Sequence, residues 1–88
     1  MKLIIAIIRD EDCDQVSQSL IQEEFRVTRI ASTGGFLRHG VTTLMIGVED
    51  EKVDQAIHLV GDHCSSEADH NGRCATLFVL KVDQFVQV

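Results

Sequence analysis

The sequence has little positive charge, no long apolar run and few cysteines. Its 88 residues include 8 Lys and Arg against 14 Asp and Glu, which gives a net charge of −6 and a pI near 5.0. This balance argues against a protein that binds nucleic acid or an anionic membrane surface. No apolar run approaches the roughly 20 residues that a membrane span needs. The 3 cysteines are an odd number, which excludes a full disulfide framework and favours free thiols or metal ligands.

The N-terminal region also lacks the features of a secretion signal. Its apolar run from Leu3 to Ile8 is too short for a signal-peptide core, and acidic residues follow it without a small-residue cleavage site. We therefore expect a cytoplasmic protein. With 44% apolar and 25% charged residues the composition is that of a globular chain, and the length allows a single domain over residues 1–88.

Hydrophobic periodicity predicts strands and helices in a regular order. Four β-branched or apolar stretches indicate strands, namely residues 2–8, 25–33, 41–48 and 74–82. Two stretches with helical apolar spacing indicate helices, one ending at about Glu24 and one running from Asp50 to Cys64. Asp10 or Asp12 is the expected N-cap of the first helix, and Asp50 that of the second. The order β-α-β-β-α-β predicts an α+β ferredoxin-like fold, in which two helices cover one face of an antiparallel four-stranded sheet.

The strand pattern predicts a second apolar surface that the helices do not cover. A sheet with water on one face alternates apolar and polar residues, and the first, third and fourth strands do not alternate. The helices direct their apolar stripes at the other face. These stripes are Cys13, Val16, Leu20 and Ile21 on the first helix and Val53, Ala56, Ile57, Val60 and Cys64 on the second. We therefore predict an oligomer in which sheets pack against sheets around a rotation axis.

The stretch from residue 26 to residue 38 combines groups that suit an anionic, aromatic ligand. It holds three of the eight cations of the chain, which are Arg26, Arg29 and Arg38. Gly34 and Gly35 let backbone amides approach phosphate oxygens, and Phe36 offers a flat apolar surface for a base. A hairpin turn with solvated arginines explains the same composition equally well.

Several strings of the sequence resemble the PII-like cyclic di-AMP receptor family. They are MKLIIAII at residues 1–8, FRVTR at 25–29, ASTGGFLR at 31–38, GVEDEKVD at 47–54 and FVLKVDQF at 78–85. The similarity covers about residues 1–64 and 74–88, and TGGFLR soon after FRVT is its most specific part. The family belongs to the PII signal-transduction superfamily of ferredoxin-like homotrimers. The resemblance therefore implies a homotrimer, in agreement with the predicted oligomer.

The resemblance also implies one cyclic di-AMP at each subunit interface. The implied ligand-binding residues are Arg26, Thr28, Gly35, Phe36, Leu37, Gly47 and Gln87. The first two face the nucleotide from the second strand, and the next three contact an adenine and the phosphates. Gly47 keeps the third strand close to the ligand, while Gln87 reaches a base from the neighbouring subunit. This chain departs from the family at Val41, where Asn is typical, and in the short connection Ser65–Arg73, which leaves the site more open.

Histidine and cysteine residues cluster around the connection between the second helix and the last strand. The cluster consists of His63, Cys64, His70 and Cys74. Its spacing matches no recognised zinc motif, and we favour a chance grouping over a metal site or a Cys64–Cys74 redox pair. No metal or cofactor is predicted. Elsewhere, His39 and His58 are expected at the surface, and Cys13 in the core.

These observations predict a signalling protein that binds a nucleotide without turning it over. Enzymatic chemistry has little support, because no nucleophile and base are placed together and the paired acids are explained by helix starts. Cyclic di-AMP is the first candidate ligand, followed by ATP or ADP, and a downstream protein of unknown identity completes the pathway. A metal- or redox-dependent interaction module on the same trimer, or a structural trimer without ligand, is the alternative.

Overall fold

The computed structural model of the chain describes residues 1–32, 40–64 and 73–88. Over these residues the order of elements is β1 (Lys2–Arg9), α1 (Cys13–Gln22), β2 (Arg26–Ser32), β3 (Val41–Val48), α2 (Val53–His63) and β4 (Ala75–Lys81). Short 3₁₀ turns precede the helices, η1 (Asp10–Asp12) before α1 and η2 (Asp50–Lys52) before α2. The predicted α+β ferredoxin-like fold is confirmed.

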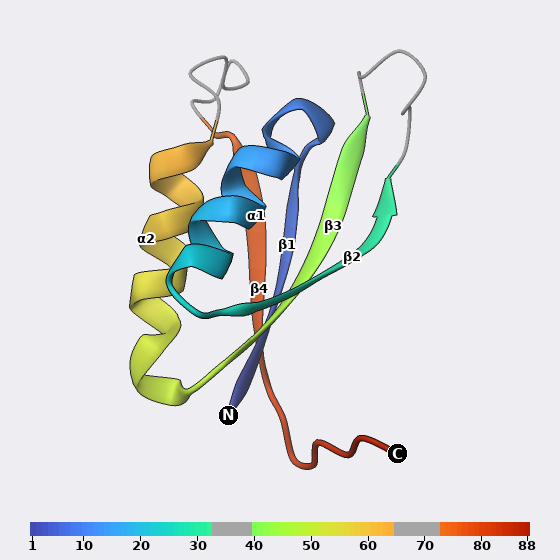
Figure 1. The fold of residues 1–88 in the computed structure, drawn as a ribbon, viewed down its shortest axis with the longest axis vertical. Helices are drawn as coiled ribbons and strands as arrows, with labels where there is room; N and C mark the ends of the chain where they lie inside the picture. Colours follow the sequence, from blue (N-terminus) through green and yellow to red (C-terminus); the bar gives the residue numbers. More distant parts are fainter. Residues whose placement is uncertain (33–39, 65–72) are drawn as a thin grey trace.

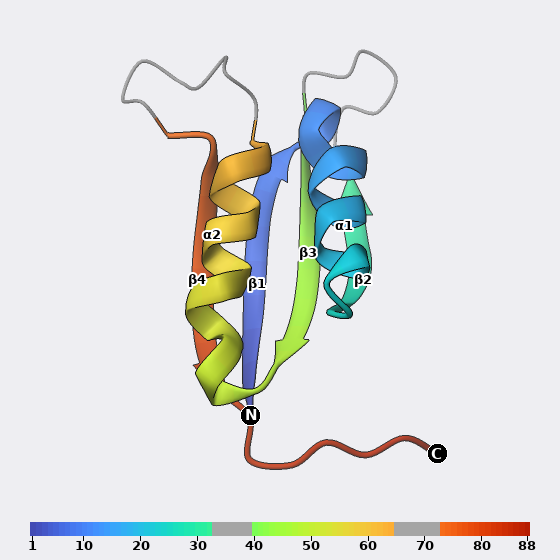
Figure 2. The same cartoon turned by 60° about the vertical axis from the view of Figure 1, so that its left-hand side comes forward.

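The sheet of the described residues has the strand order β2-β3-β1-β4, and all neighbouring strands are antiparallel. Both helices lie on the same face of this sheet, as Figure 2 shows. The first and last residues of the chain lie at the same end of the sheet (Figure 1). Residues 33–39 and 65–72 lie outside the described residues.

The hydrophobic core lies between the helices and the sheet. Alternate residues of the central strands β1 and β3 are buried there, because successive strand residues point to opposite faces. These core residues are Ile4, Ala6 and Ile8 from β1 and Leu44, Ile46 and Val48 from β3. The helices contribute Val16 and Leu20 from α1 and Ala56 and Val60 from α2, all of them predicted core positions.

The opposite face of the sheet carries apolar side chains that no described segment buries fully. Leu3, Ile5 and Ile7 alternate with the buried residues of β1 and are half-buried. On β4, Phe78 pairs with Ile5 and is 51% exposed, and Leu80 pairs with Leu3 and is 46% exposed. The uncovered second face therefore exists in the single chain, and the trimer that would cover it stays a prediction.

The predicted N-cap position of the first helix is confirmed for Asp12, whereas Asp10 and Asp50 begin the 3₁₀ turns η1 and η2. The Asp12 side chain makes no capping hydrogen bond to the amides of α1. Asp10 instead accepts a hydrogen bond from the Thr42 hydroxyl of β3, and Asp50 pairs with the N-terminal ammonium 3.0 Å away. Asp12 occupies the N-cap position of α1 in helical backbone conformation, and its side chain is buried. The 3₁₀ turns displace each helix start by three residues, so the acids meet tertiary partners rather than the helix amides.

Two predicted core residues of the helices are exposed instead. Ile21 is 58% exposed and Ile57 is 38% exposed, since each lies at the margin of its apolar stripe. Leu59 of α2 packs against the core although the predicted stripe omitted it. Helix α1 also ends at Gln22, two residues before the predicted end. Among the described helices, none is both long and apolar enough to cross a membrane.

Candidate functional site

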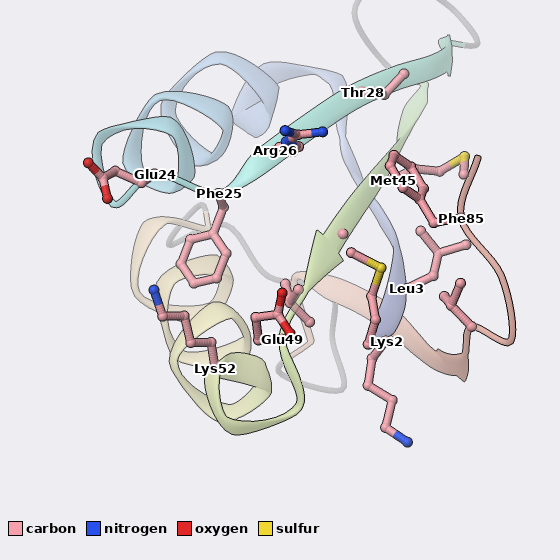
Figure 3. Close-up of a pocket in the computed structure, with 14 residues that line it drawn as sticks. Lys2, Leu3, Glu24, Phe25, Arg26, Thr28, Met45, Glu49, Lys52 and Phe85 are labelled. Atoms are coloured by element: carbon pink, nitrogen blue, oxygen red, sulfur yellow. The ribbon is translucent and has the colours of Figure 1, made fainter. Parts of the chain in front are cut away.

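A pocket of about 530 Å³ lies at the end of the sheet where the chain starts. It is bordered by the start of β1, the start of β2, the end of β3, the turn η2 and the segment after β4 (Figure 3). The volume falls in the range of small-molecule sites, which is about 300–1,000 Å³. Three of the predicted ligand-binding residues, Arg26, Thr28 and Gly47, line this one pocket.

Arg26 and Thr28 reach the pocket because they occupy alternate positions of β2. Arg26 pairs with Gly47 and Thr28 with Met45 on the neighbouring strand β3, so both lie on the sheet face away from the helices. Phe25 and Val27 point to the other side, where Phe25 is buried in the core. The predicted placement of Phe25 and Val27 on one face of β2, and of Arg26 and Thr28 on the other, is confirmed.

The turn between α1 and β2 fixes where this edge strand begins. Glu24 has a φ of 67°, and its amide donates to the carbonyl of Ile21, while the Phe25 amide donates to the carbonyl of Leu20 at 3.0 Å. This is a Schellman motif, in which a left-handed residue ends the helix and satisfies its last carbonyls. Its geometry buries Phe25 and brings Glu24 and Arg26 to the pocket.

Gly47 leaves the floor of the pocket open. It lies between Leu3 of β1 and Arg26 of β2 in the sheet register. A Cβ atom added at Gly47 would meet no atom within 4 Å, and its φ is not in the left-handed region. The glycine is therefore not required by the backbone, and the space that it leaves belongs to the pocket.

Charged residues from separate segments give the pocket mixed electrostatics with a positive excess. Among its described lining residues, Lys2, Arg26 and Lys52 are cationic, and Glu24 and Glu49 are acidic. A local positive excess in a chain of net charge −6 favours an anionic ligand over a cationic one.

Arg29, which the sequence grouped with Arg26, does not contribute to this pocket. Its guanidinium lies 2.9 Å from the Asp14 carboxylate of α1, on the helix side of the sheet. The hydrogen bond with Asp14 raises the pKa of Arg29 above its ordinary value. The two arginines of β2 thus have separate roles, because they are three residues apart and point to opposite faces.

Of the remaining predicted ligand residues, only Gln87 is among the described residues. Gln87 is exposed in the tail after β4 and does not line the pocket. Gly35, Phe36 and Leu37, together with His39, lie outside the described residues. Val41, the position of the family departure, is exposed at the start of β3, at the far end of that strand from Gly47.

Sequence reasoning missed several residues of the pocket. Met45 and Phe85 supply apolar surface on one side of it, and Lys2 and Lys52 supply charge (Figure 3). Met45 was accessible from the sequence, because it lies two residues before Gly47 on the same strand face. The other three come from segments without a shared motif. Only the fold brings them together.

The histidine and cysteine cluster lies at the opposite end of the sheet. His63 ends α2, and its Nδ1 donates to the Leu59 carbonyl at 2.9 Å. Cys64 and Cys74 are free thiols, and His70 lies outside the described residues. Among the described residues no group of three or more His, Cys, Asp or Glu is placed to hold a metal ion. His58 is exposed and Cys13 is buried, as predicted.

The fold is that of a ferredoxin-like α+β domain with a pocket at one end of its sheet. A family model described as cyclic-di-AMP receptor matches residues 1–71. The chain belongs to this family of PII-like proteins. The chain is also similar to a functionally unknown protein from Pediococcus pentosaceus ATCC 25745, known from its crystal structure. The two are 34% identical with a TM-score of 0.79, over 99% of this chain and 96% of that one.

Proposed function

We propose that this protein is a PII-like signalling protein that binds cyclic di-AMP without turnover and relays its presence to a partner protein in the cytoplasm. The observation that carries the proposal is the convergence of Arg26, Thr28 and Gly47 on one pocket. Membership of the cyclic-di-AMP receptor family supports the ligand class. ATP and ADP are the competing ligands, since they share the adenine and the phosphate charge.

The proposed site is shared between subunits of a homotrimer. The apolar sheet face with its exposed Phe78 and Leu80 supports self-association, because water contact with such a surface is unfavourable. The pocket of a single chain is lined by its own Phe85, and Gln87 two residues later is proposed to reach the pocket of a neighbour. The positive excess at the pocket suits the two phosphates of a cyclic dinucleotide.

Calorimetric titration of the wild-type protein with cyclic di-AMP, ATP and ADP tests the proposal. We expect heat with cyclic di-AMP at about 100 μM protein, where even weak micromolar binding is measurable, and weaker or no heat with the other two. Tighter binding of ATP or ADP would replace the proposed ligand. No heat with any of the three would remove the proposed function.

A matched pair of arginine variants tests the position of the site. Arg26→Ala removes a charged donor from the pocket, and we expect affinity to fall about 10- to 150-fold, since a hydrogen bond to a charged group contributes roughly 1.5–3 kcal/mol. Arg29→Ala removes a cation from the same strand but from the helix side, where it pairs with Asp14. This control should bind like wild type. Equal affinity of both variants would place the ligand elsewhere.

A further inference from the structure

Cys64 and Cys74 lie at the two ends of the connection between α2 and β4. Cys64 is the C-cap of α2, and Cys74 directly precedes Ala75, the first residue of β4. The end of α2 and the start of β4 lie at the same end of the molecule, away from the two termini (Figures 1 and 2). Cys64 and Ala75 both pack against the hydrophobic core. The fold therefore holds these two thiols near each other independently of the segment that links them.

The neighbouring Cys74 influences the ionisation of Cys64. Partial burial, and then the nearby Cys74 thiol, raise the pKa of Cys64 from 9.0 to about 12. The carboxylate of Asp12 raises this pKa further, while Arg9 lowers it. Asp12 is only 5% exposed, and its Oδ2 has no hydrogen-bond partner among the described residues. The surroundings of Cys64 thus favour the protonated thiol over the thiolate.

The third cysteine has a different environment. Cys13 begins α1, is 3% exposed and lies 3.9 Å from the Ser17 hydroxyl. Its burial keeps dissolved oxidants away from its sulfur. A two-cysteine reaction in one chain is therefore restricted to Cys64 and Cys74, and Cys13 can be removed as a control.

We propose that Cys64 and Cys74 form a reversible intramolecular disulfide, with a low-molecular-weight disulfide such as oxidised glutathione as the oxidant. The inference does not depend on the nucleotide proposal, because the pair lies at the opposite end of β1 from the pocket: Ile8 of β1 pairs with Ala75, whereas Lys2 lines the pocket.

The reaction proceeds by two thiol–disulfide exchanges. Cys74 loses its proton, and its sulfur attacks one sulfur of oxidised glutathione, so that the glutathione S–S bond breaks and one glutathione leaves and takes up a proton. The sulfur of Cys64 then loses its proton and attacks the Cys74 sulfur of the mixed disulfide, which releases the second glutathione as a thiol. Two protein thiols are oxidised by two electrons, and oxidised glutathione is reduced to two glutathione thiols. Partial burial raises the pKa of Cys64 and so disfavours its thiolate, which makes Cys64 the resolving thiol in this scheme.

The disulfide links the end of α2 covalently to the start of β4. Closing the loop between residues 64 and 74 reduces the conformational freedom of the unfolded chain. For a loop of this length in a domain of this size, we expect the Tm to rise by about 10 °C or more. Reduction with dithiothreitol should reverse this rise.

Mass spectrometry of the whole protein, equilibrated in buffers of increasing oxidised-to-reduced glutathione ratio, tests the proposal. We expect a species that has lost two hydrogen atoms, with a linked Cys64–Cys74 peptide after digestion, in both wild type and Cys13→Ala. Cys64→Ser should instead accumulate one glutathione on Cys74, because the resolving thiol is missing. Free, alkylatable thiols in excess oxidised glutathione would overturn the proposal. So would a wild-type protein that holds glutathione on both cysteines or forms disulfides between chains.

Discussion

Gly47→Val is the sharpest perturbation of the pocket, because it should change stability and binding in opposite directions. The added Cβ meets no atom within 4 Å, and the backbone is not in the left-handed region, so the strand accepts a side chain there without strain. Replacing a strand glycine under these conditions removes an entropic cost of about 0.5–1 kcal/mol. In a domain of this size the Tm should rise by about 2–8 °C.

The same substitution should weaken ligand binding. The new side chain projects into the pocket of about 530 Å³ between Leu3 and Arg26, where a bound base or phosphate lies in our proposal. Overfilling a fitted contact costs roughly 1–3 kcal/mol, which corresponds to an affinity loss of about 5- to 150-fold. Calorimetric titration with cyclic di-AMP and thermal unfolding without ligand measure the two effects separately.

Gly61→Ala is the matched control for this experiment. Gly61 lies on α2, outside the pocket, and a Cβ there also meets no atom within 4 Å. Alanine in a helix is favoured over glycine by about 1 kcal/mol, so the Tm should rise in this variant as well. Its affinity for ligand should equal that of wild type. The reasoning fails if Gly47→Val binds as tightly as Gly61→Ala.

Three further predictions concern assembly and stability. Phe78→Glu places a charge on the exposed sheet face, where it should prevent the predicted assembly. Sedimentation should then show 9.8 kDa monomers for the variant and trimers for wild type. Wild-type monomers at micromolar concentration would contradict the predicted oligomer. Glu24 has a φ of 67°, which is strained for a residue with a side chain and unstrained for glycine. Glu24→Gly should therefore raise the free energy of unfolding by about 0.5–1 kcal/mol in urea titrations. A lower urea midpoint in the variant would show that the backbone at Glu24 is not strained. Folding raises the pKa of Cys64 from 9.0 to about 12, so its contribution to stability is present below pH 9 and is lost as the pH rises towards 12. Between about pH 8 and pH 11, the free energy of unfolding of Cys64→Ala should therefore fall less than that of wild type in urea titrations. If the two proteins lose the same free energy over this range, the pKa of Cys64 is not raised by folding.

The sequence predicted the strands better than the helix ends. β3 has the predicted bounds Val41–Val48, because an uninterrupted β-branched and apolar run between polar segments fits a buried strand. The caps could not be predicted in the same way. A carboxylate before a helix is a good local acceptor, but its partner is chosen by the tertiary structure: the Thr42 hydroxyl for Asp10 and the N-terminal ammonium for Asp50. No local pattern contains that information.

The part of the candidate site that lies on one strand could be predicted from the sequence. Alternation along β2 placed Arg26 and Thr28 on one face, and the pocket contains both. Composition alone misled at Arg29, since a count of nearby cations does not distinguish the two faces of a strand. Lys52 and Phe85 contribute to the pocket from a 3₁₀ turn and from the tail after β4. Their position depends on the packing of α2 and on the course of the chain beyond the sheet, and neither follows from spacing in the sequence.

Strand β1 runs through the sheet from the pocket to the start of β4, so substitutions at its two ends should act independently of each other. Lys2 at the pocket and Ile8 beside the start of β4 are six residue steps apart, which is a distance of about 20 Å along the strand. Effects of substitutions more than about 10 Å apart and without shared partners usually add. The double variant Arg26→Ala and Cys74→Ser should therefore combine the affinity of one single variant with the redox behaviour of the other. Either end of the sheet can then be redesigned as a module while the other is kept.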